Sequence, residues 1–185
     1  MHRFIFFFLF LSMAATETLK TPEYILIKKN GRIEIRAYSE YVIAKTSVEN
    51  ADLNIDSNMF RVLANYIFGG NERSQSIPMT APVITKKENS SYDMIFFMLD
   101  AENSEELPMP NSSKISIEKM KIGKTVSITF GMWATDKRVD YYKDKLDKYV
   151  VNNNLEINSP MMIAQYNSPW AVPPFRKNEL IYRIK

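Results

Sequence analysis

Two residue types are almost missing from this chain of 185 residues, which has no cysteine and a single histidine, His2. The lack of cysteine excludes disulfide bonds and cysteine-containing zinc sites. His2 lies at the very start, and a chain that loses it has no imidazole for Ser–His or Cys–His nucleophilic catalysis. These chemistries therefore depend on whether the N-terminal segment stays on the protein.

The N-terminal segment has the pattern of a secretory signal peptide. An unbroken apolar run at 4–11 follows a short basic start and precedes small residues at 12–15. The run is shorter than the ~20 residues that span a bilayer. We expect residues 1–15 to be a signal peptide, cleaved after Ala14 or Ala15, and the protein to be secreted, periplasmic or extracellular, with no transmembrane segment left. The alternatives are an uncleaved anchor and a buried strand.

Neither sign of charge is in large excess, since 24 basic residues stand against 21 acidic ones. The basic residues are interspersed, so the chain lacks the basic patch of a nucleic-acid-binding protein, and we expect no such partner. Only 5 glycines occur, without a glycine-rich phosphate loop, and no acidic cluster has calcium-loop spacing. We expect one domain, residues 20–185, that binds a small apolar or amphipathic ligand; the oligomeric state stays open.

Periodicity predicts eight strands and two helices. The strands fall at 32–37, 41–47, 76–84, 92–99, 114–121, 125–130, 161–166 and 179–184. The helices run from Ser57 or Asn58 to Phe68, and from Thr135 or Asp136 to about Asn152. The order strand-strand-helix-strand-strand thus occurs twice. It predicts an α+β fold in which an antiparallel sheet, as a barrel, is flanked by two helices.

Several motifs occur in a fixed order along the chain. They are Phe60-x-x-Leu63-x-x-Tyr66-Ile67-x-Gly69-x-Asn71, Ile77-Pro-Met-Thr-Ala-Pro-Val83, Phe96-Phe97-Met98, Leu107-Pro108-x-Pro110, Tyr166-Asn-x-Pro169-Trp170 and Arg176-Lys-Asn-Glu179. Together they resemble the SOUL heme-binding protein family over about residues 22–184. The resemblance implies a distorted antiparallel β-barrel flanked by two helices and built from two pseudo-symmetric ββαββ halves. It also implies a relation to bacterial effector-binding domains, which hold small ligands in a groove.

The same resemblance implies heme or another tetrapyrrole as the ligand. Some family members are described as using a histidine axial ligand, and here the only histidine lies in the expected signal peptide. Two routes remain open. A methionine or tyrosine can ligate heme iron, although core packing is the ordinary role of either. Alternatively, an apolar groove with basic groups at its edge can hold the porphyrin without a protein axial ligand.

The resemblance places that groove along the first helix. The candidate ligand-binding residues are therefore Ser57, Phe60, Ala64 and Phe68, which border the core face, and Arg61 beside them. Trp170 could form a second wall, although an aromatic loop more often plugs a barrel end. Arg176 could meet the propionates or could equally be a solvated surface residue.

A different function, as a hydrolase, is possible on the basis of Glu179. An effector-binding-like small-molecule module could use this glutamate, beside tyrosines, as the general base of a hydrolase. That role requires Glu179 to open into a pocket with a tyrosine within hydrogen-bond reach. The same carboxylate could instead pair with Arg176 or Arg36. We expect a non-enzymatic binding protein, and the third class, an exported protein-interaction module, would need an exposed apolar patch.

Overall fold

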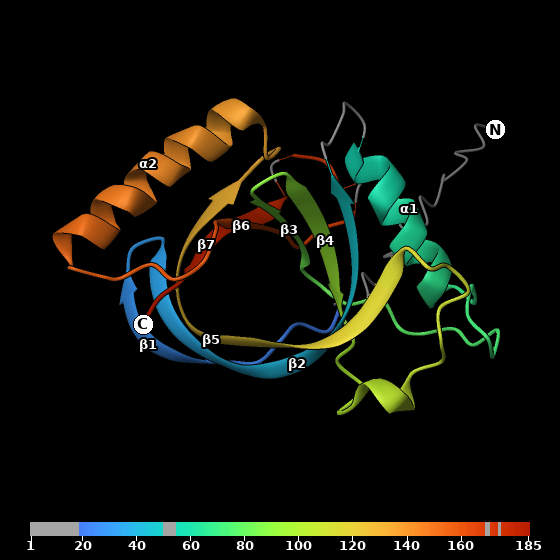
Figure 1. Ribbon diagram of the computed structural model, residues 1–185. Coiled ribbons are helices and arrows are strands. Elements are labelled where there is room, and N and C mark those ends of the chain that lie inside the picture. The colour runs from blue at the N-terminus through green and yellow to red at the C-terminus, as the bar shows by residue number, and fades with distance from the viewer. Residues whose placement is uncertain (1–18, 50–54, 169–170, 174) are drawn as a thin grey trace, which may run out of the picture.

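The structure is a computed structural model that describes residues 19–49, 55–168, 171–173 and 175–185 (Figure 1). The expected signal peptide at 1–15 lies outside the described residues. The candidate residue Trp170 lies outside them as well.

The described residues form an antiparallel barrel with two helices. In chain order the elements are β1 (Tyr24–Asn30), β2 (Ile33–Glu49), α1 (Ile55–Ile67), β3 (Val83–Glu88), β4 (Ser91–Phe97), the 3₁₀ turn η1 (Ser104–Glu106), β5 (Ile115–Gly131), α2 (Asp136–Asn152), β6 (Met162–Gln165) and β7 (Lys177–Arg183). The sheet order is β1-β2-β4-β3-β6-β7-β5, and β5 also pairs with β2. This last pairing closes the barrel from β2 to β5 and leaves β1 as a further strand beside β2. The expected α+β fold is confirmed.

β2 and β5 are each 17 residues long and pair with each other along most of their length. The prediction of separate strands at 32–37 and 41–47, and again at 114–121 and 125–130, is therefore wrong. Gly123, with φ of +70°, lies at the point where a break was expected. Because glycine tolerates this conformation, β5 passes through the point without ending, and the second half of the fold reads β5-α2-β6-β7.

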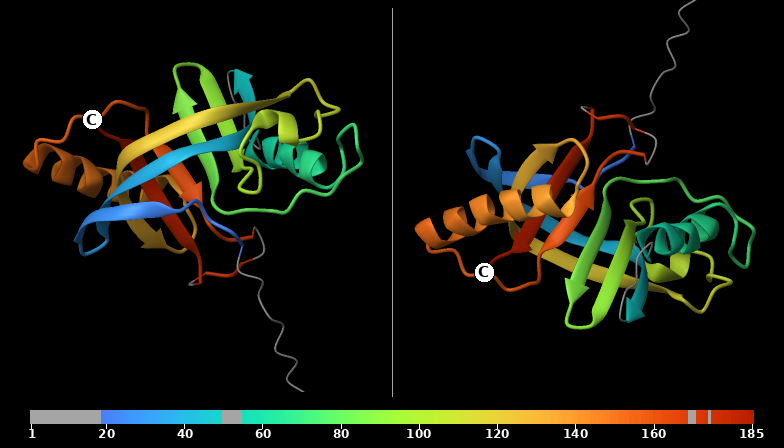
Figure 2. Two further views of the ribbon diagram at one scale, coloured as in Figure 1. Left: turned by 90° about the horizontal axis from the view of Figure 1, so that it is seen from below. Right: turned by 90° about the horizontal axis from the view of Figure 1, so that it is seen from above.

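The helices cover two different outer faces of the barrel and lie at its opposite ends (Figure 2). α1 packs Met59, Leu63, Tyr66 and Ile67 against residues of β2 and β4, which confirms its predicted apolar face. α2 packs Val139, Leu146 and Val150 against residues of β5 and β7. Burial of one such side chain contributes about 1.5–3 kcal/mol, so these stripes anchor both helices. No helix within the described residues is long and apolar enough to cross a membrane.

Other strand boundaries also differ from the prediction, and one strand was missed. β3 begins only at Val83, and the preceding residues 76–82 are irregular. Pro78 and Pro82 lie there, and proline cannot donate to a strand ladder. β1 was missed because every residue in it is exposed, so its apolar and polar residues show no alternation.

A third group of side chains fills the barrel itself. Inward-facing apolar residues come from strands β2 to β7, and they include Ile43, Ile84, Phe97, Ile122, Met162 and Ile181. Successive residues of a strand face opposite sides, so the same strands supply both the interior and the faces under the helices. The polar residues described below occupy positions on the inward faces.

Candidate ligand-binding sites

A groove of about 230 Å³ lies between α1, residues 79–83 and residues 165–168. Its wall includes Phe60, Phe68, Met79, Ala81 and Val83. Phe68 is 71% exposed, and Phe60 packs edge-on against Phe96 with 5.5 Å between ring centroids. An exposed apolar wall of this kind is typical of a site where a ligand or a partner protein binds.

The predicted helix stripe contributes unequally to this groove. Phe60 and Phe68 lie in its wall. Ser57 and Arg61 are exposed and Ala64 is half-buried, and the structure places none of these three in the wall. The groove therefore uses the two aromatic members of the stripe.

Arg176 does not line the groove but contacts Ser168, which does. Its guanidinium carbon sits 3.6 Å from the centroid of the Trp133 ring. Its Nε donates a hydrogen bond to the carbonyl of Ala171 at 2.8 Å, and Nη2 donates to the carbonyl of Ser168 at 3.3 Å. The side chain is buried, which lowers the pKa of this arginine. The burial of Arg176 contradicts the solvated surface role, whereas its contact with a propionate stays a prediction.

The rest of the groove was not predicted from the sequence. Alternation placed Met79, Ala81 and Val83 on one face, but nothing local joined that face to α1. Two isolated bridges make the connection, Phe68 to Ser76 and Lys20 to Thr80. The first bridge turns the chain back beside the end of α1, and the second joins the N-terminal segment to residue 80. Only the fold shows that Met79, Ala81 and Val83 share a wall with Phe60.

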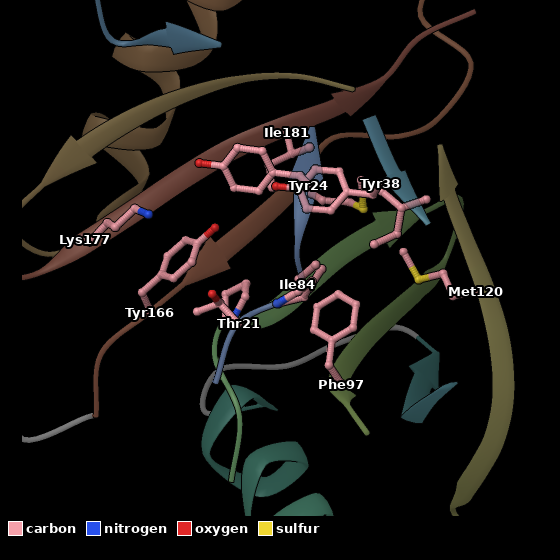
Figure 3. A pocket seen from close by; sticks show the side chains of 13 residues that line it. Thr21, Tyr24, Tyr38, Ile84, Phe97, Met120, Tyr166, Lys177 and Ile181 are labelled. Carbon is pink, nitrogen blue, oxygen red and sulfur yellow. The ribbon is translucent and has the colours of Figure 1, made fainter. Parts of the chain in front are cut away.

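A second cavity, of about 140 Å³, lies within the barrel (Figure 3). Its apolar wall is formed by Ile84, Phe97, Met120, Ile122, Met162 and Ile181. Tyr24, Tyr38, Tyr166 and Lys177 add polar groups, and the segment at Thr21-Pro22 also lines it. We call this cavity the barrel pocket.

The strand period explains why charged groups lie behind the barrel pocket. On β2, Ile33 and Ile35 pack towards α2, so Arg36 and Tyr38 belong to the opposite face. On β7, Leu180 packs towards α2, and Glu179 is again on the opposite face. The sheet register then brings Arg36 and Glu179 together, although 143 residues separate them.

Glu179 is fully buried and its carboxylate is surrounded by donors. Arg36 donates to it twice, from Nη1 to Oε2 at 2.8 Å and from Nη2 to Oε1 at 2.9 Å. The Tyr166 hydroxyl donates to Oε2 at 2.8 Å, and the Thr129 hydroxyl donates to Oε1 at 3.2 Å. The ammonium of Lys177 lies 3.4 Å from Oε1.

These contacts keep the glutamate ionised. Burial alone would raise the pKa of Glu179, but the hydrogen bonds and charge of Arg36, with Lys177 and Tyr166, outweigh burial and lower it. Burial and the charge of Glu179 raise the pKa of the Tyr166 phenol well above its usual range. Burial raises the pKa of Tyr38 to about 12, although Arg36 lowers it. The two phenols therefore stay protonated at neutral pH.

The geometry required for a glutamate base is met only in part. Tyr166 is within hydrogen-bond reach, as a hydrolase would need. Glu179 itself does not line the barrel pocket, however, and it pairs with Arg36, one of the two partners considered from the sequence. A carboxylate with a lowered pKa and occupied oxygens is a weak general base.

The groove along α1 fits heme as a partly covered plate. Its apolar wall suits the face of a porphyrin, and Met79 brings a thioether that can ligate iron. At about 230 Å³ the groove is smaller than the ~300–1,000 Å³ of a pocket that encloses a drug-sized ligand. Residues 19–185 contain no histidine. The described residues also contain no cluster of three or more His, Cys, Asp or Glu side chains for a metal ion.

Solved structures share this architecture at low sequence identity. A hydrolase from Listeria innocua is 8% identical, with a TM-score of 0.60 over 85% of this chain and 94% of that one. The EcmrR C-terminal domain is 11% identical, with a TM-score of 0.61 over 83% of this chain and 96% of that one. At such identities the likeness concerns the fold alone.

The family of this protein is shown by its sequence. Among curated proteins, none matches the chain. The sequence profile described as SOUL heme-binding protein matches residues 19–183, nearly the whole chain, and every motif quoted above lies within this range. The chain therefore belongs to the SOUL heme-binding protein family.

Proposed function

We propose that this protein binds heme, or a similar apolar ligand, in the groove along α1 without a histidine axial ligand and without catalysing a reaction. One observation carries the proposal. Phe68 is 71% exposed, yet it shares an apolar wall with Phe60 and Met79 in a member of a heme-binding family. A porphyrin face laid on that wall would remove its apolar surface from water, at about 25 cal/mol for each Å² covered.

Met79 is the residue in the groove best suited to hold heme iron. When bound, heme supplies an iron centre that a thioether or a phenolate can ligate. Tyr166 also lines the groove, but its phenol donates to Glu179 and its pKa is raised by burial and by that charge. Forming its phenolate beside a buried carboxylate is costly. The thioether of Met79 carries no proton and meets no such cost.

Titration of the purified protein with hemin tests the proposal. We expect a saturable shift of the Soret band, and we expect Phe68→Glu to weaken binding by about tenfold or more because a carboxylate replaces apolar contact. Val151→Glu is the matched control, since Val151 is 72% exposed on α2, at the other end of the barrel. Equal weakening by both variants, or no Soret shift at all, would contradict the groove assignment.

A second variant separates iron ligation from burial. Met79→Leu keeps the apolar volume and removes the sulfur. If Met79 ligates iron, the variant changes the Soret position and the spin state of the complex. If porphyrin burial alone holds the ligand, the spectrum stays the same and the affinity changes by less than about threefold.

The hydrolase alternative has weaker support. The Glu179 carboxylate is paired with Arg36 and does not line the barrel pocket. Hydrolysis of a p-nitrophenyl ester that is abolished by Glu179→Gln, with the fold intact, would revive this alternative.

We also propose that residues 1–15 direct export and are then removed. The support is the apolar run at 4–11, the basic start before it and the small residues after it. Sequencing the N-terminus of the protein from its native source tests this. A chain that still begins at Met1 would contradict it and would return His2 to the list of candidate ligands.

A further inference from the structure

We propose that the barrel pocket is a second binding site, beside the groove along α1 with which it shares Tyr166, and that it takes small carboxylic acids with one ring-sized apolar body. Benzoate is the simplest probe of this class. Three features support it: the size of the pocket, the hydrogen bonds that already occupy Glu179, and Lys177, the one cation among the described residues that lines the cavity.

The size of the pocket limits the ligand. Its volume is about 140 Å³, close to the ~150 Å³ of an engineered apolar cavity in another protein that binds benzene. One side of the wall is apolar, with Phe97, Met120 and Ile181 among its members. A single aromatic ring or a short branched chain fits this space, and a porphyrin does not.

Glu179 cannot serve as an anchor for a cationic ligand. Both carboxylate oxygens already accept from Arg36, and Tyr166 and Thr129 add further donors. The carboxylate is also fully buried behind the pocket wall. A ligand cation would have to displace the arginine, which would leave a buried guanidinium with its strongest partner removed.

The ion-pair network that contains Arg36 and Glu179 has an excess of one positive charge. Lys29 pairs with Glu34 at 2.8 Å, Arg36 contacts both Glu34 and Glu179, and Lys177 approaches Glu179. These are three cations against two carboxylates. Of the three cations, only Lys177 lines the pocket.

Lys177 is placed to meet an anion. Its Nζ lies 3.9 Å from the centroid of the Tyr166 ring, and its side chain is 48% exposed. Figure 3 shows Lys177 and Tyr166 on one side of the cavity, with Phe97 and Met120 on the other. A carboxylic acid whose ring lies among the apolar residues would therefore direct its carboxylate towards the ammonium.

Tyr38 adds a neutral donor at the same site. Its hydroxyl oxygen accepts from Nη1 of Arg36 at 3.1 Å, and within the described residues no acceptor is seen for the hydroxyl proton. Tyr38 is half-buried, and its phenol, whose pKa is raised, remains protonated at neutral pH. It can donate to a carboxylate oxygen, so both polar groups favour an anion over a cation.

Calorimetry with three probes of similar size tests the proposal: benzoate, benzyl alcohol and benzyltrimethylammonium. We expect benzoate to bind most tightly of the three. We expect Lys177→Met to weaken benzoate by about tenfold or more, the range for loss of a charge-assisted hydrogen bond. Lys87→Met, an exposed lysine of β3 outside the pocket, should leave binding unchanged.

A pocket-filling variant locates the site without changing any charge. Met120 is only half-buried, so Met120→Trp places a ring in the cavity without emptying the core. We expect it to abolish benzoate binding while the hemin titration is unchanged. If benzyltrimethylammonium binds more tightly than benzoate, if benzoate does not bind at concentrations on the order of 10 mM, or if Met120→Trp leaves benzoate binding intact, the proposal is overturned.

Discussion

Arg36 on β2 and Glu179 on β7 are joined by two hydrogen bonds, of 2.8 and 2.9 Å, although 143 residues separate them. Both side chains are buried, and β5 lies between their strands in the sheet. Two buried charges cost several kcal/mol of hydration, which their attraction offsets only when the geometry is good. The pair therefore makes the fold sensitive to the loss of either member.

Removing the carboxylate should destabilise the protein strongly. Glu179→Gln leaves the buried Arg36 with only Glu34 as a charged partner, and we expect the free energy of unfolding to fall by about 3 kcal/mol. Urea denaturation measures this. Replacing both members, as in Arg36→Met with Glu179→Leu, should cost less than the two single changes combined, because no unpaired charge remains. Additive costs would show that the pair contributes no coupling.

The same pair predicts an acid-dependent loss of stability. Burial opposes ionisation of Glu179, but Arg36 outweighs it and lowers the pKa in the folded protein, whereas the unfolded chain has a pKa of about 4.3. The contribution is therefore fully present above about pH 4.3 and is lost as the pH falls through the folded pKa. Between about pH 5 and 3 the wild type should lose stability more steeply than Glu179→Gln. Parallel pH profiles would contradict this assignment.

Asn71 should be required for the turn after α1. Its Nδ2 donates to the carbonyls of Tyr66 and Gln75 at 3.0 and 2.7 Å, and its Oδ1 accepts from the backbone of Arg73 and Gln75. The side chain is buried, so Asn71→Ala leaves these groups without partners, and we expect a loss of about 2–4 kcal/mol.

The control for Asn71 is an exposed asparagine in a similar position after a helix. Asn153 follows α2 and donates a single side-chain hydrogen bond to Tyr149, so Asn153→Ala should cost less than about 1 kcal/mol. Thermal unfolding compares the two, at roughly 2–4 °C for each kcal/mol in a chain of this size. A similar fall in Tm for both variants would show that the four bonds of Asn71 contribute little.

Gly70 should not tolerate a side chain. A Cβ atom there would lie 2.3 Å from Nδ2 and 2.6 Å from the backbone oxygen of Asn65. Since the second contact is with backbone, we expect Gly70→Ala to destabilise by about 2–3 kcal/mol. At Gly31 nothing lies within 4 Å and only φ of +58° opposes a side chain, so Gly31→Ala should cost about 1 kcal/mol. A smaller loss at Gly70 than at Gly31 would contradict the predicted clash.

The helices were predicted well because apolar residues that recur about every 3.6 positions all lie on the side of a helix that contacts the core. Met59, Leu63, Tyr66 and Ile67 are all buried where the 3.6-residue period placed them. The strands were less predictable. β1 is exposed throughout and shows no alternation, and residues near Gly123 were interpreted as a break when β5 runs through them.

Some residues of the candidate sites could likewise be predicted from the sequence, and others could not. Phe60 and Phe68 could be named as candidates because the family resemblance implies a groove along this helix and their spacing puts them on one side of it. Met79 and Val83 share the groove wall with them only in the folded chain. Arg176 stacks on Trp133, a contact that no sequence interval indicates.

The sequence by itself determined that the region after the expected signal peptide has no histidine or cysteine, that two amphipathic helices form, and that the chain resembles one family. Composition, a period of 3.6 residues and short motifs are properties of neighbouring residues. Only the tertiary structure decided that Glu179 pairs with Arg36 and that the barrel pocket faces Lys177. Both depend on the register in which β2, β5 and β7 align, and that register is set by packing across the whole barrel.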